Sequence, residues 1–200
     1  RGSAINIEQG IKLLFQLFCS LDFNVNKFRT SSITIHPMIS IIIPVYNEED
    51  NIGELISYIR TNSPAKKVEI IVVDGGSTDK TRGVATTAGA LVIESPRKGR
   101  SWQMNAGAEK ASGEYLYFLH ADTFPPETFI ADIKHEVAAG FECGCFRLRF
   151  DDDHPALRFY SWFTRFDIDL FRFGDQSLFV EKKLFKEVGA FNTNLLVMED

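Results

Sequence analysis

One short stretch of the chain places a chemically useful group directly after an apolar segment. Residues 115–119 read Tyr-Leu-Tyr-Phe-Leu, a run typical of a buried strand, and the polarity changes at His120 and Asp122. Ligands of open α/β sheets bind beyond the carboxyl ends of the strands, so a carboxylate here is a candidate for ligand or metal binding. The alternative is that Asp122 only caps a helix that begins after Pro126.

Two more predicted strands end in polar loops. The apolar runs at 39–46 and 68–73 are typical of strands that are buried on both faces of a parallel sheet. The first run leads into Tyr46-Asn47-Glu48-Glu49 and the second into Asp74-Gly75-Gly76. With Asp122, these loops would bring polar groups of three strands to the same edge of the sheet. Asn47 could instead cap a helix, and the glycines could simply allow a left-handed turn.

Helices alternate with the strands from Met38 onward. Apolar residues in 49–59 have the spacing of one helical face, and a second helix, capped by Ser77 or Thr78, is predicted to end near Thr87. Further helices are predicted at 101–111, 127–139 and 182–188, and further strands at 90–94, 143–150 and 177–180. The alternating order predicts an α/β fold with a mostly parallel central sheet.

Composition limits the classes of function. The chain has 200 residues, enough for one domain with a sizeable core, and a formal net charge of -5, which argues against nucleic-acid binding. Cys19, Cys143 and Cys145 form neither an even disulfide framework nor a zinc site, so we expect free thiols in a reducing compartment. We therefore expect a cytoplasmic protein, with the inner face of the membrane as a second location.

The region before Met38 is predicted to be an N-terminal extension (residues 1–37) of unknown role. Its apolar part, 11–21, is about half of the roughly 20 residues that span a bilayer and contains Lys12. An amphipathic helix or accessory segment is the better interpretation. Residues 38–200 would then form one catalytic domain.

The motifs in that domain resemble those of glycosyltransferase family 2. They are Ile-Ile-Ile-Pro-Val-Tyr-Asn-Glu-Glu (41–49), Val-Val-Asp-Gly-Gly-Ser-Thr-Asp-Lys-Thr (72–81), Asn-Ala-Gly (105–107), Gly-Glu-Tyr-Leu-Tyr-Phe-Leu-His-Ala-Asp-Thr (113–123), Gly-Asp-Gln (174–176) and Met-Glu-Asp (198–200). The Leu-His-Ala-Asp-Thr motif is similar to that of small bacterial transferases of this family. The resemblance implies a GT-A (Rossmann-like) three-layer fold, a nucleotide-diphosphate-sugar donor, Mg²⁺ or Mn²⁺ as cofactor, and inversion at the anomeric carbon.

The resemblance also implies roles for individual residues. The nucleoside-binding positions are matched by Pro44, Tyr46, Glu48 and Asp74, and the basic positions that face the phosphates by Lys98 and Arg100. Asp122 matches the last Asp of the metal motif, and its hard oxygen suits either cation. Asp200 matches the general base that takes the proton of the acceptor hydroxyl. Asp175, Gln176 and Glu199 match the acceptor side.

Two positions depart from the family pattern. His120 stands where many relatives have the first Asp of the metal motif, so Asp122 with water is expected to hold the cation and His120 is a second candidate ligand. His120 could instead only bond a backbone carbonyl. Gly75 replaces a common second Asp, which leaves fewer polar contacts for the nucleoside.

The last third of the chain carries two unusual compositions. Asp151-Asp152-Asp153 is interpreted as a solvated turn, and the aromatic and basic segment 154–173 as either a helix packed across the sheet or a surface that meets lipid or sugar. The acceptor is accordingly expected to be a lipid or glycan hydroxyl, with possible peripheral membrane contact. Because relatives continue past the proposed base, we expect a domain that is truncated at its C-terminus, in which nucleotide binding survives better than transfer.

Two other functions are compatible with these residues. A nucleotidyltransferase with a similar sheet would usually have a Gly-rich, basic loop after its first strand, whereas the loop here is acidic. A non-catalytic module that binds nucleotide sugars is compatible with the missing first Asp and with the chain end at Asp200.

Overall fold

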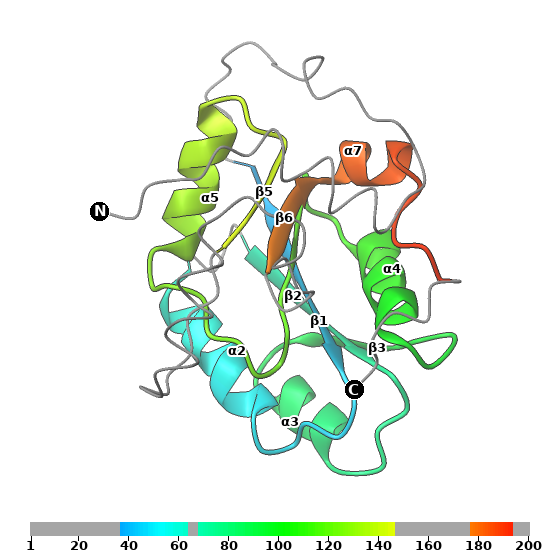
Figure 1. The fold of residues 1–200 in the computed structure, drawn as a ribbon. Helices are drawn as coiled ribbons and strands as arrows, with labels where there is room; N and C mark the ends of the chain where they lie inside the picture. The colour runs from blue at the N-terminus through cyan, green and yellow to red at the C-terminus, as the bar shows by residue number, and fades with distance from the viewer. Residues whose placement is uncertain (1–36, 64–67, 147–176, 194–200) are drawn as a thin grey trace, which may run out of the picture.

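The central strand of the fold is β1 (Ile39–Val45), whose residues are apolar on both faces. We describe residues 37–63, 68–146 and 177–193 of a computed structural model. In it, β1 lies between β2 (Val68–Asp74) and β4 (Tyr115–Phe118) and runs parallel to both (Figure 1). The isoleucines at 39, 41, 42 and 43 are fully buried, as a strand that is almost wholly apolar predicts, and the one polar residue among them, Ser40, is buried too.

The sheet has six strands in the order β3-β2-β1-β4-β6-β5. Strand β3 (Leu91–Glu94) pairs with β2 in parallel. Strand β6 (Leu178–Glu181) is antiparallel to β4, and the short β5 (Cys143–Cys145) is antiparallel to β6. The predicted mostly parallel sheet is therefore confirmed.

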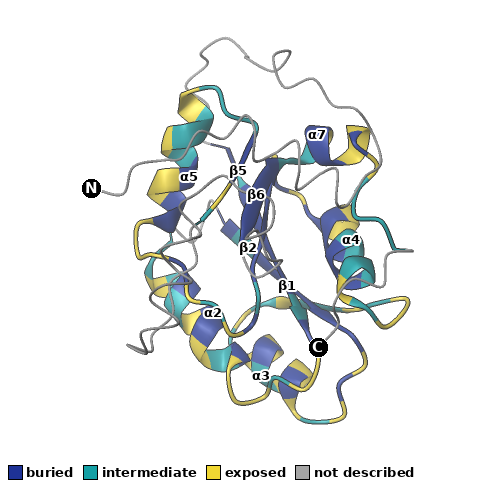
Figure 2. Ribbon diagram, viewed as in Figure 1, coloured by how far each residue is buried: buried dark blue, intermediate teal, exposed yellow. Residues whose placement is uncertain are grey.

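Helices cover both faces of this sheet (Figure 1). On one face, α2 (Ile52–Thr61), α3 (Thr81–Thr87) and α5 (Phe129–Ala138) surround a core that includes Ile41, Leu55 and Phe129. On the other, α4 (Arg100–Lys110) and α7 (Lys182–Glu187) pack over a core that includes Ile42 and Phe185. The predicted three-layer α/β architecture is thus confirmed, and Figure 2 shows that buried residues lie along the strands and on the helices that cover them.

Local details of two helix starts differ from the sequence-based expectation. Helix α2 begins at Ile52, three residues later than predicted, although its predicted apolar face is buried. Helix α3 begins at Thr81 after Lys80, and neither Ser77 nor Thr78 caps it. Those two residues are instead hydrogen-bonded to Asn47 across the neighbouring loop. A tertiary contact has replaced the local cap.

None of the helices in the described ranges is long and apolar enough to cross a membrane. The two described cysteines, Cys143 and Cys145, are free thiols as predicted. Burial raises the pKa of the Cys143 thiol to about 12, so this group stays protonated at neutral pH.

Helix α4 approaches β1 and β2 closely at Gly107. A Cβ atom there would overlap Cγ2 of Ile42 and would lie 3.0 Å from Cγ2 of Val73. Both methyl groups belong to strands that are buried in the sheet, so neither can move away cheaply. The absence of a side chain at Gly107 is what lets α4 lie this near the strands.

We therefore expect Gly107→Ala to destabilise the protein by about 1–3 kcal/mol through overpacking. Gly83→Ala is the matched control, because a Cβ at Gly83 in α3 meets no atom within 4 Å. That control should gain up to about 1 kcal/mol from the higher helix propensity of alanine. Urea denaturation measures both changes, and equal stabilities of the two variants would contradict the close-packing account.

A carboxyl group with an unusual environment lies at the opposite, amino edge of β4. The Oε2 atom of Glu142 is buried and makes no hydrogen bond. Burial raises the pKa of Glu142 to about 7, and the nearby carboxylates of Glu181 and Glu187 contribute in the same direction. The folded protein therefore favours the protonated form of this group.

This raised pKa predicts a pH dependence of stability. Between about pH 4.5 and 7 the unfolded chain loses the proton of Glu142 while the folded chain retains it, so the contribution of this group to stability falls as the pH rises through that window. Glu142→Gln should flatten the dependence there and stabilise the protein more at pH 8 than at pH 4. Thermal unfolding across the pH range tests this, and parallel profiles for parent and variant would contradict it.

Candidate active site

The strands on the two sides of β1 separate from it at different points. Strand β2 pairs with β1 as far as Val45, but pairing with β4 stops at Ile42, whose carbonyl accepts a final 3.0 Å bond from the N–H of Leu119. The chain also reverses its order here, because β2 and β3 follow β1 on one side and β4 lies on the other. Such topological switch points are where open α/β sheets bind ligands.

Pro44 lies at a point in β1 where a proline removes no hydrogen bond of the sheet. Neighbouring residues of a strand direct their backbone groups to opposite sides. The carbonyl of Val45 accepts from Gly75 on the β2 side, and that of Ile42 accepts from the β4 side. Pro44 therefore faces the β4 side, beyond the last pair, where its missing N–H removes no ladder bond.

The loops after β1, β2 and β4 (46–51, 75–80 and 119–128) form what we call the rim. Tyr46 lies on the first loop with 51% of its surface exposed, and the ammonium of Lys98 lies 5.2 Å from the centre of its ring. Glu48 accepts a 2.9 Å bond from the side chain of Asn51 through one carboxylate oxygen, and the other oxygen bonds no described residue. An aromatic face, a carboxylate and a cation thus lie within reach of a ligand at the end of β1.

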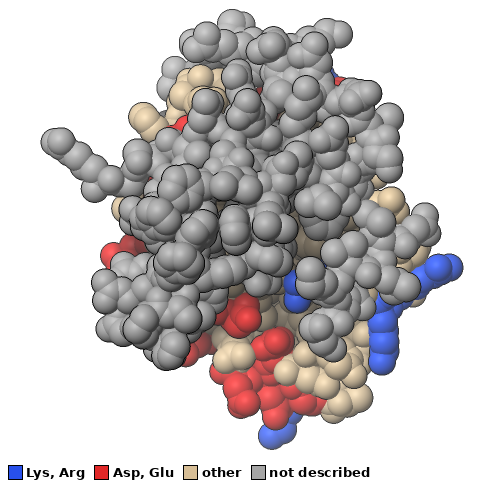
Figure 3. Space-filling view, viewed as in Figure 1, with Lys and Arg blue, Asp and Glu red and all other residues tan. Residues whose placement is uncertain are grey.

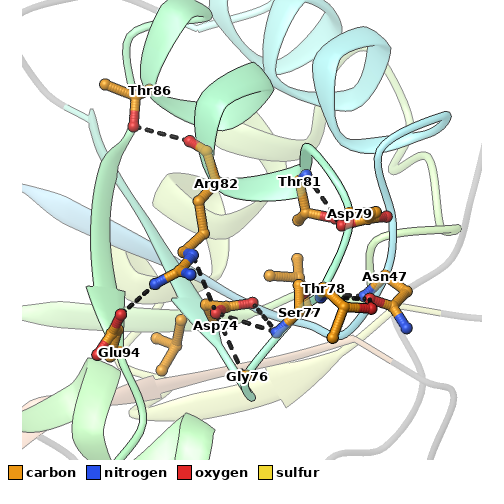
Figure 4. A network of polar contacts seen from close by, with 12 residues as sticks. Asn47, Asp74, Gly76, Ser77, Thr78, Asp79, Thr81, Arg82, Thr86 and Glu94 are labelled. Carbon is orange, nitrogen blue, oxygen red and sulfur yellow. Dashed lines mark hydrogen bonds and ion pairs between the residues drawn. The ribbon is translucent and has the colours of Figure 1, made fainter.

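Asp74, the last residue of β2, is turned into the loop that follows it (Figure 4). The residue is only 1% exposed, and its carboxylate accepts from the backbone N–H groups of Gly76 at 3.3 Å and of Ser77 at 3.1 Å. The Nε atom of Arg82 lies 3.6 Å away, and the same guanidinium also pairs with Glu94. A contact between Asp74 and a nucleoside base stays a prediction, and such a base would share oxygens that already accept bonds from the turn.

Gln103, on α4, connects the ends of β1 and β2. Its buried side-chain nitrogen donates 2.8 Å bonds to the carbonyls of both Val45 and Val73. A Cβ atom on Gly75 would lie 3.0 Å from that nitrogen. This gives a physical reason for glycine at position 75, because an aspartate there would press on a side chain held by two buried hydrogen bonds.

Asp122 lies on the exposed part of the rim, four residues beyond the end of β4. One of its oxygens contacts the hydroxyl of Thr123 at 3.2 Å, and His120, which is half-buried, accepts from the N–H of Thr123 through its carbonyl. Helix α5 begins only at Phe129, so Asp122 is not its cap. The side-chain OH of Tyr58 in α2 donates a 2.6 Å bond to the carbonyl of Pro125 and thereby fixes this loop.

The charge on the rim is mainly negative. Acidic atoms gather at the lower edge of the face in Figure 3, where the loops after β1 and β2 lie. The acidic residues of those loops are Glu48, Glu49, Asp50 and Asp79. An anionic ligand would be repelled here unless a cation accompanied it.

The described residues suit one mode of metal binding. No group of three or more His, Cys, Asp or Glu side chains that could hold a metal occurs among them. Mg²⁺ commonly uses one or two carboxylates together with substrate phosphates, and the exposed carboxylate of Asp122 can serve in that way. The donor set therefore fits a cation that arrives with a diphosphate.

Several predicted site residues cannot be placed. Asp175, Gln176, Glu199 and Asp200 lie outside the described residues, as do 1–36, the acidic run 151–153 and the aromatic segment 154–173. Arg100 is the first residue of α4, two positions after Lys98, and the contact of both residues with a diphosphate stays a prediction.

Sequence reasoning missed three residues that organise the site. Gln103 is a polar residue on the buried face of α4, four positions before Gly107, and that placement was a usable signal. Nothing in the local sequence pointed to the bond between Tyr58 and Pro125 or to the pairing of Arg82 with Asp74, because both depend on how separate elements pack.

Comparison with known proteins identifies the family of this chain. The family model described as glycosyl transferase family 2 matches residues 40–186. Glycosyltransferase AglE of Haloferax volcanii is 35% identical over 101 residues, which cover 47% of this chain and 33% of that protein. A PGL/p-HBAD biosynthesis glycosyltransferase of Mycobacterium tuberculosis is 29% identical over 175 residues, covering 82% of this chain and 67% of that protein.

Solved structures give the same result for the fold. The mannosyltransferase PcManGT of Pyrobaculum calidifontis, in complex with GDP-Man and Mn²⁺, has a TM-score of 0.64 at 22% identity, over 84% of this chain and 51% of that chain. Glucosyl-3-phosphoglycerate synthase of Mycobacterium tuberculosis, in complex with Mn²⁺, UDP-Glc and phosphoglyceric acid, has a TM-score of 0.54 at 22% identity, over 74% and 58%. The fold is GT-A. The chain therefore belongs to glycosyl transferase family 2.

Proposed function

We propose that this chain is the catalytic domain of an inverting glycosyltransferase that moves a sugar from a nucleotide-diphosphate-sugar donor to a hydroxyl acceptor. The observation that carries the proposal is the exposed carboxylate of Asp122, which follows β4 at the switch point beside β1. Tyr46 and Glu48 follow β1 on the other side of this divergence, and we expect one ligand to contact all three groups.

The nucleoside end of the donor is assigned to the loop after β1. The ring of Tyr46 offers a face for a base, and the carboxylate of Glu48 can accept ribose hydroxyls. Pro44 lies at the same divergence, and Asp74 is the candidate to accept a hydrogen bond from the base. The GDP-Man and UDP-Glc in the complexes of the two structural relatives support a donor of this class without choosing between guanine and uracil.

The diphosphate end requires positive charge on an acidic rim. Part of this positive charge would come from Lys98, in the loop before α4, and from Arg100, the first residue of that helix. Asp122, with His120 as a second candidate ligand, would hold Mg²⁺ or Mn²⁺. When bound, the cation would neutralise the diphosphate and stabilise it as a leaving group. Mn²⁺ is present in both relatives' complexes, which favours it as the first cation to test.

Transfer needs a base on the acceptor side. We assign that role to Asp200, which would take the proton of the acceptor hydroxyl as its oxygen attacks the anomeric carbon and the bond to the diphosphate breaks. Glu199, Asp175 and Gln176 would contact the acceptor. A relative named undecaprenyl-phosphate 4-deoxy-4-formamido-L-arabinose transferase, from Pseudomonas fluorescens, supports an acceptor that carries a lipid.

The first test uses the coupling between cation and nucleotide. Because the described site offers few protein ligands, Mn²⁺ alone should bind weakly, and UDP or GDP should tighten its binding by about tenfold or more. Asp122→Asn should abolish that gain. Asp132→Asn in α5 is the matched control, because an amide oxygen there can still accept from Thr128.

Calorimetric titration of Mn²⁺, with and without each nucleotide, measures the coupling. Tight Mn²⁺ binding without nucleotide, or an Asp122→Asn variant that couples like the control, would contradict the assignment of Asp122.

The second test concerns transfer. Asp200→Asn should lower kcat by about 10²–10⁴ and leave the donor Kd nearly unchanged, because a general base acts on the acceptor and not on the nucleotide. UDP-glucose and GDP-mannose are the donors to try first, with phosphoglyceric acid as the hydroxyl acceptor and the product anomer read by NMR. Transfer by the variant at the parent's rate would refute the base, and a retained anomeric configuration would refute inversion.

A further inference from the structure

Asn47, between Tyr46 and Glu48, has a backbone conformation that side chains rarely adopt. Its φ is 54°, in the left-handed region. Asparagine tolerates this region better than most residues, and alanine or a branched residue does not. The left-handed residue reverses the chain direction at the end of β1, so that Tyr46 lies by Lys98 while the carbonyl of Glu48 accepts from Ile52 at the start of α2.

The loop around Asn47 is held by the loop that follows β2 (Figure 4). Three successive backbone N–H groups donate to side chains of that loop: Asn47 to Ser77 at 2.9 Å, Glu48 to Thr81 at 2.8 Å and Glu49 to Asp79 at 3.2 Å. The two loops therefore form one unit although about 30 residues separate them along the chain.

The side chain of Asn47 completes this connection in the opposite direction. Its Oδ1 accepts from the backbone N–H of Thr78 at 2.9 Å and from the Thr78 hydroxyl at 3.3 Å. Asn47 is thus both the residue with the unusual φ and an acceptor that the neighbouring loop depends on. The loop after β2 is also the one that encloses Asp74.

We infer that Asn47 is a positioning residue that presents Tyr46 and Glu48 to the nucleoside of the donor. The inference rests on the proposed function. Asn47 acts through its neighbours: its φ sets their directions, and its Oδ1 fixes that geometry before a ligand arrives. A binding site has higher affinity when its residues are already ordered in the free protein, because binding then costs less conformational entropy.

Three substitutions separate the two properties of Asn47. Asn47→Asp keeps the acceptor and tolerates the left-handed region, Asn47→Gly keeps only the conformation, and Asn47→Ala loses both. Asn62→Ala is the control, because Asn62 follows the last turn of α2, away from the rim, and within the described part of the chain its side chain bonds only the carbonyl of Tyr58.

The readouts are the Kd of UDP and GDP with Mn²⁺, kcat at saturating donor, and hydrogen exchange of the Thr78 amide. We expect Asn47→Ala to weaken nucleotide binding on the order of tenfold and Asn47→Gly by a smaller factor, with Asn47→Asp rescuing most of the loss. The effect should appear in Kd and KM, with kcat changed less than about twofold, because Asn47 does not touch the reacting atoms. Exchange at Thr78 should quicken in the alanine and glycine variants and not in the control.

Two results would overturn this inference and leave the proposed function standing. One is nucleotide affinity that is equal in parent and all three variants. The other is a loss in Asn47→Ala that Asn62→Ala matches at the same loss of thermal stability, because a merely structural role would produce that result. If the parent bound neither nucleotide, the proposed function would itself be wrong and the inference would fall with it.

Discussion

The unequal pairing of β1 is the constraint on which the rest of the site depends. Strand β2 stays paired to Val45, whereas β4 leaves after Ile42, so the last residues of β1 have a partner on one side only. Pro44 therefore has no strand partner on the β4 side, at the edge of an otherwise buried sheet. The order of the strands produces this divergence, because the chain places β2 and β3 on one side of β1 and β4 on the other. The proposed roles of Pro44, Tyr46 and Asp122 in binding depend on their positions around the divergence of β1 and β4.

Polar side chains, more than apolar packing, give this edge its shape. Gln103 donates to the carbonyls of Val45 and Val73 near the ends of two strands, and Asp74 accepts from the N–H groups of the turn that follows it. Leaving such buried groups without partners would cost free energy, so each bond specifies one arrangement of the loops. The close approach of α4 at Gly107 is what brings Gln103 within reach. The result is a rim that is made of loops and yet is held in several places.

The elements that sequence analysis predicted well are those whose signal is local and periodic. Buried elements were identified from the isoleucine-rich sequence of β1 and from the apolar spacing of α2. The alternation of predicted strands and helices was sufficient to predict the α/β class. The capping roles predicted for Ser77 and Thr78 were wrong because both residues bond Asn47 in another loop, and no pattern within ten residues contains that information. The enclosure of Asp74 was equally out of reach, since Arg82 and the following turn create it. For Asp122 the sequence identified its position at a strand end and the structure its exposure; the residues on the acceptor side stay predictions.

The most direct test of the account is the location of bound Mn²⁺ and nucleoside in a crystal grown with a nucleoside diphosphate. The account predicts an anomalous manganese peak within coordination distance of the Asp122 carboxylate, bridged to the diphosphate, with the base on the ring of Tyr46. Manganese at the amino edge of the sheet near Glu142, or a nucleoside bound away from the divergence of β1 and β4, would contradict it.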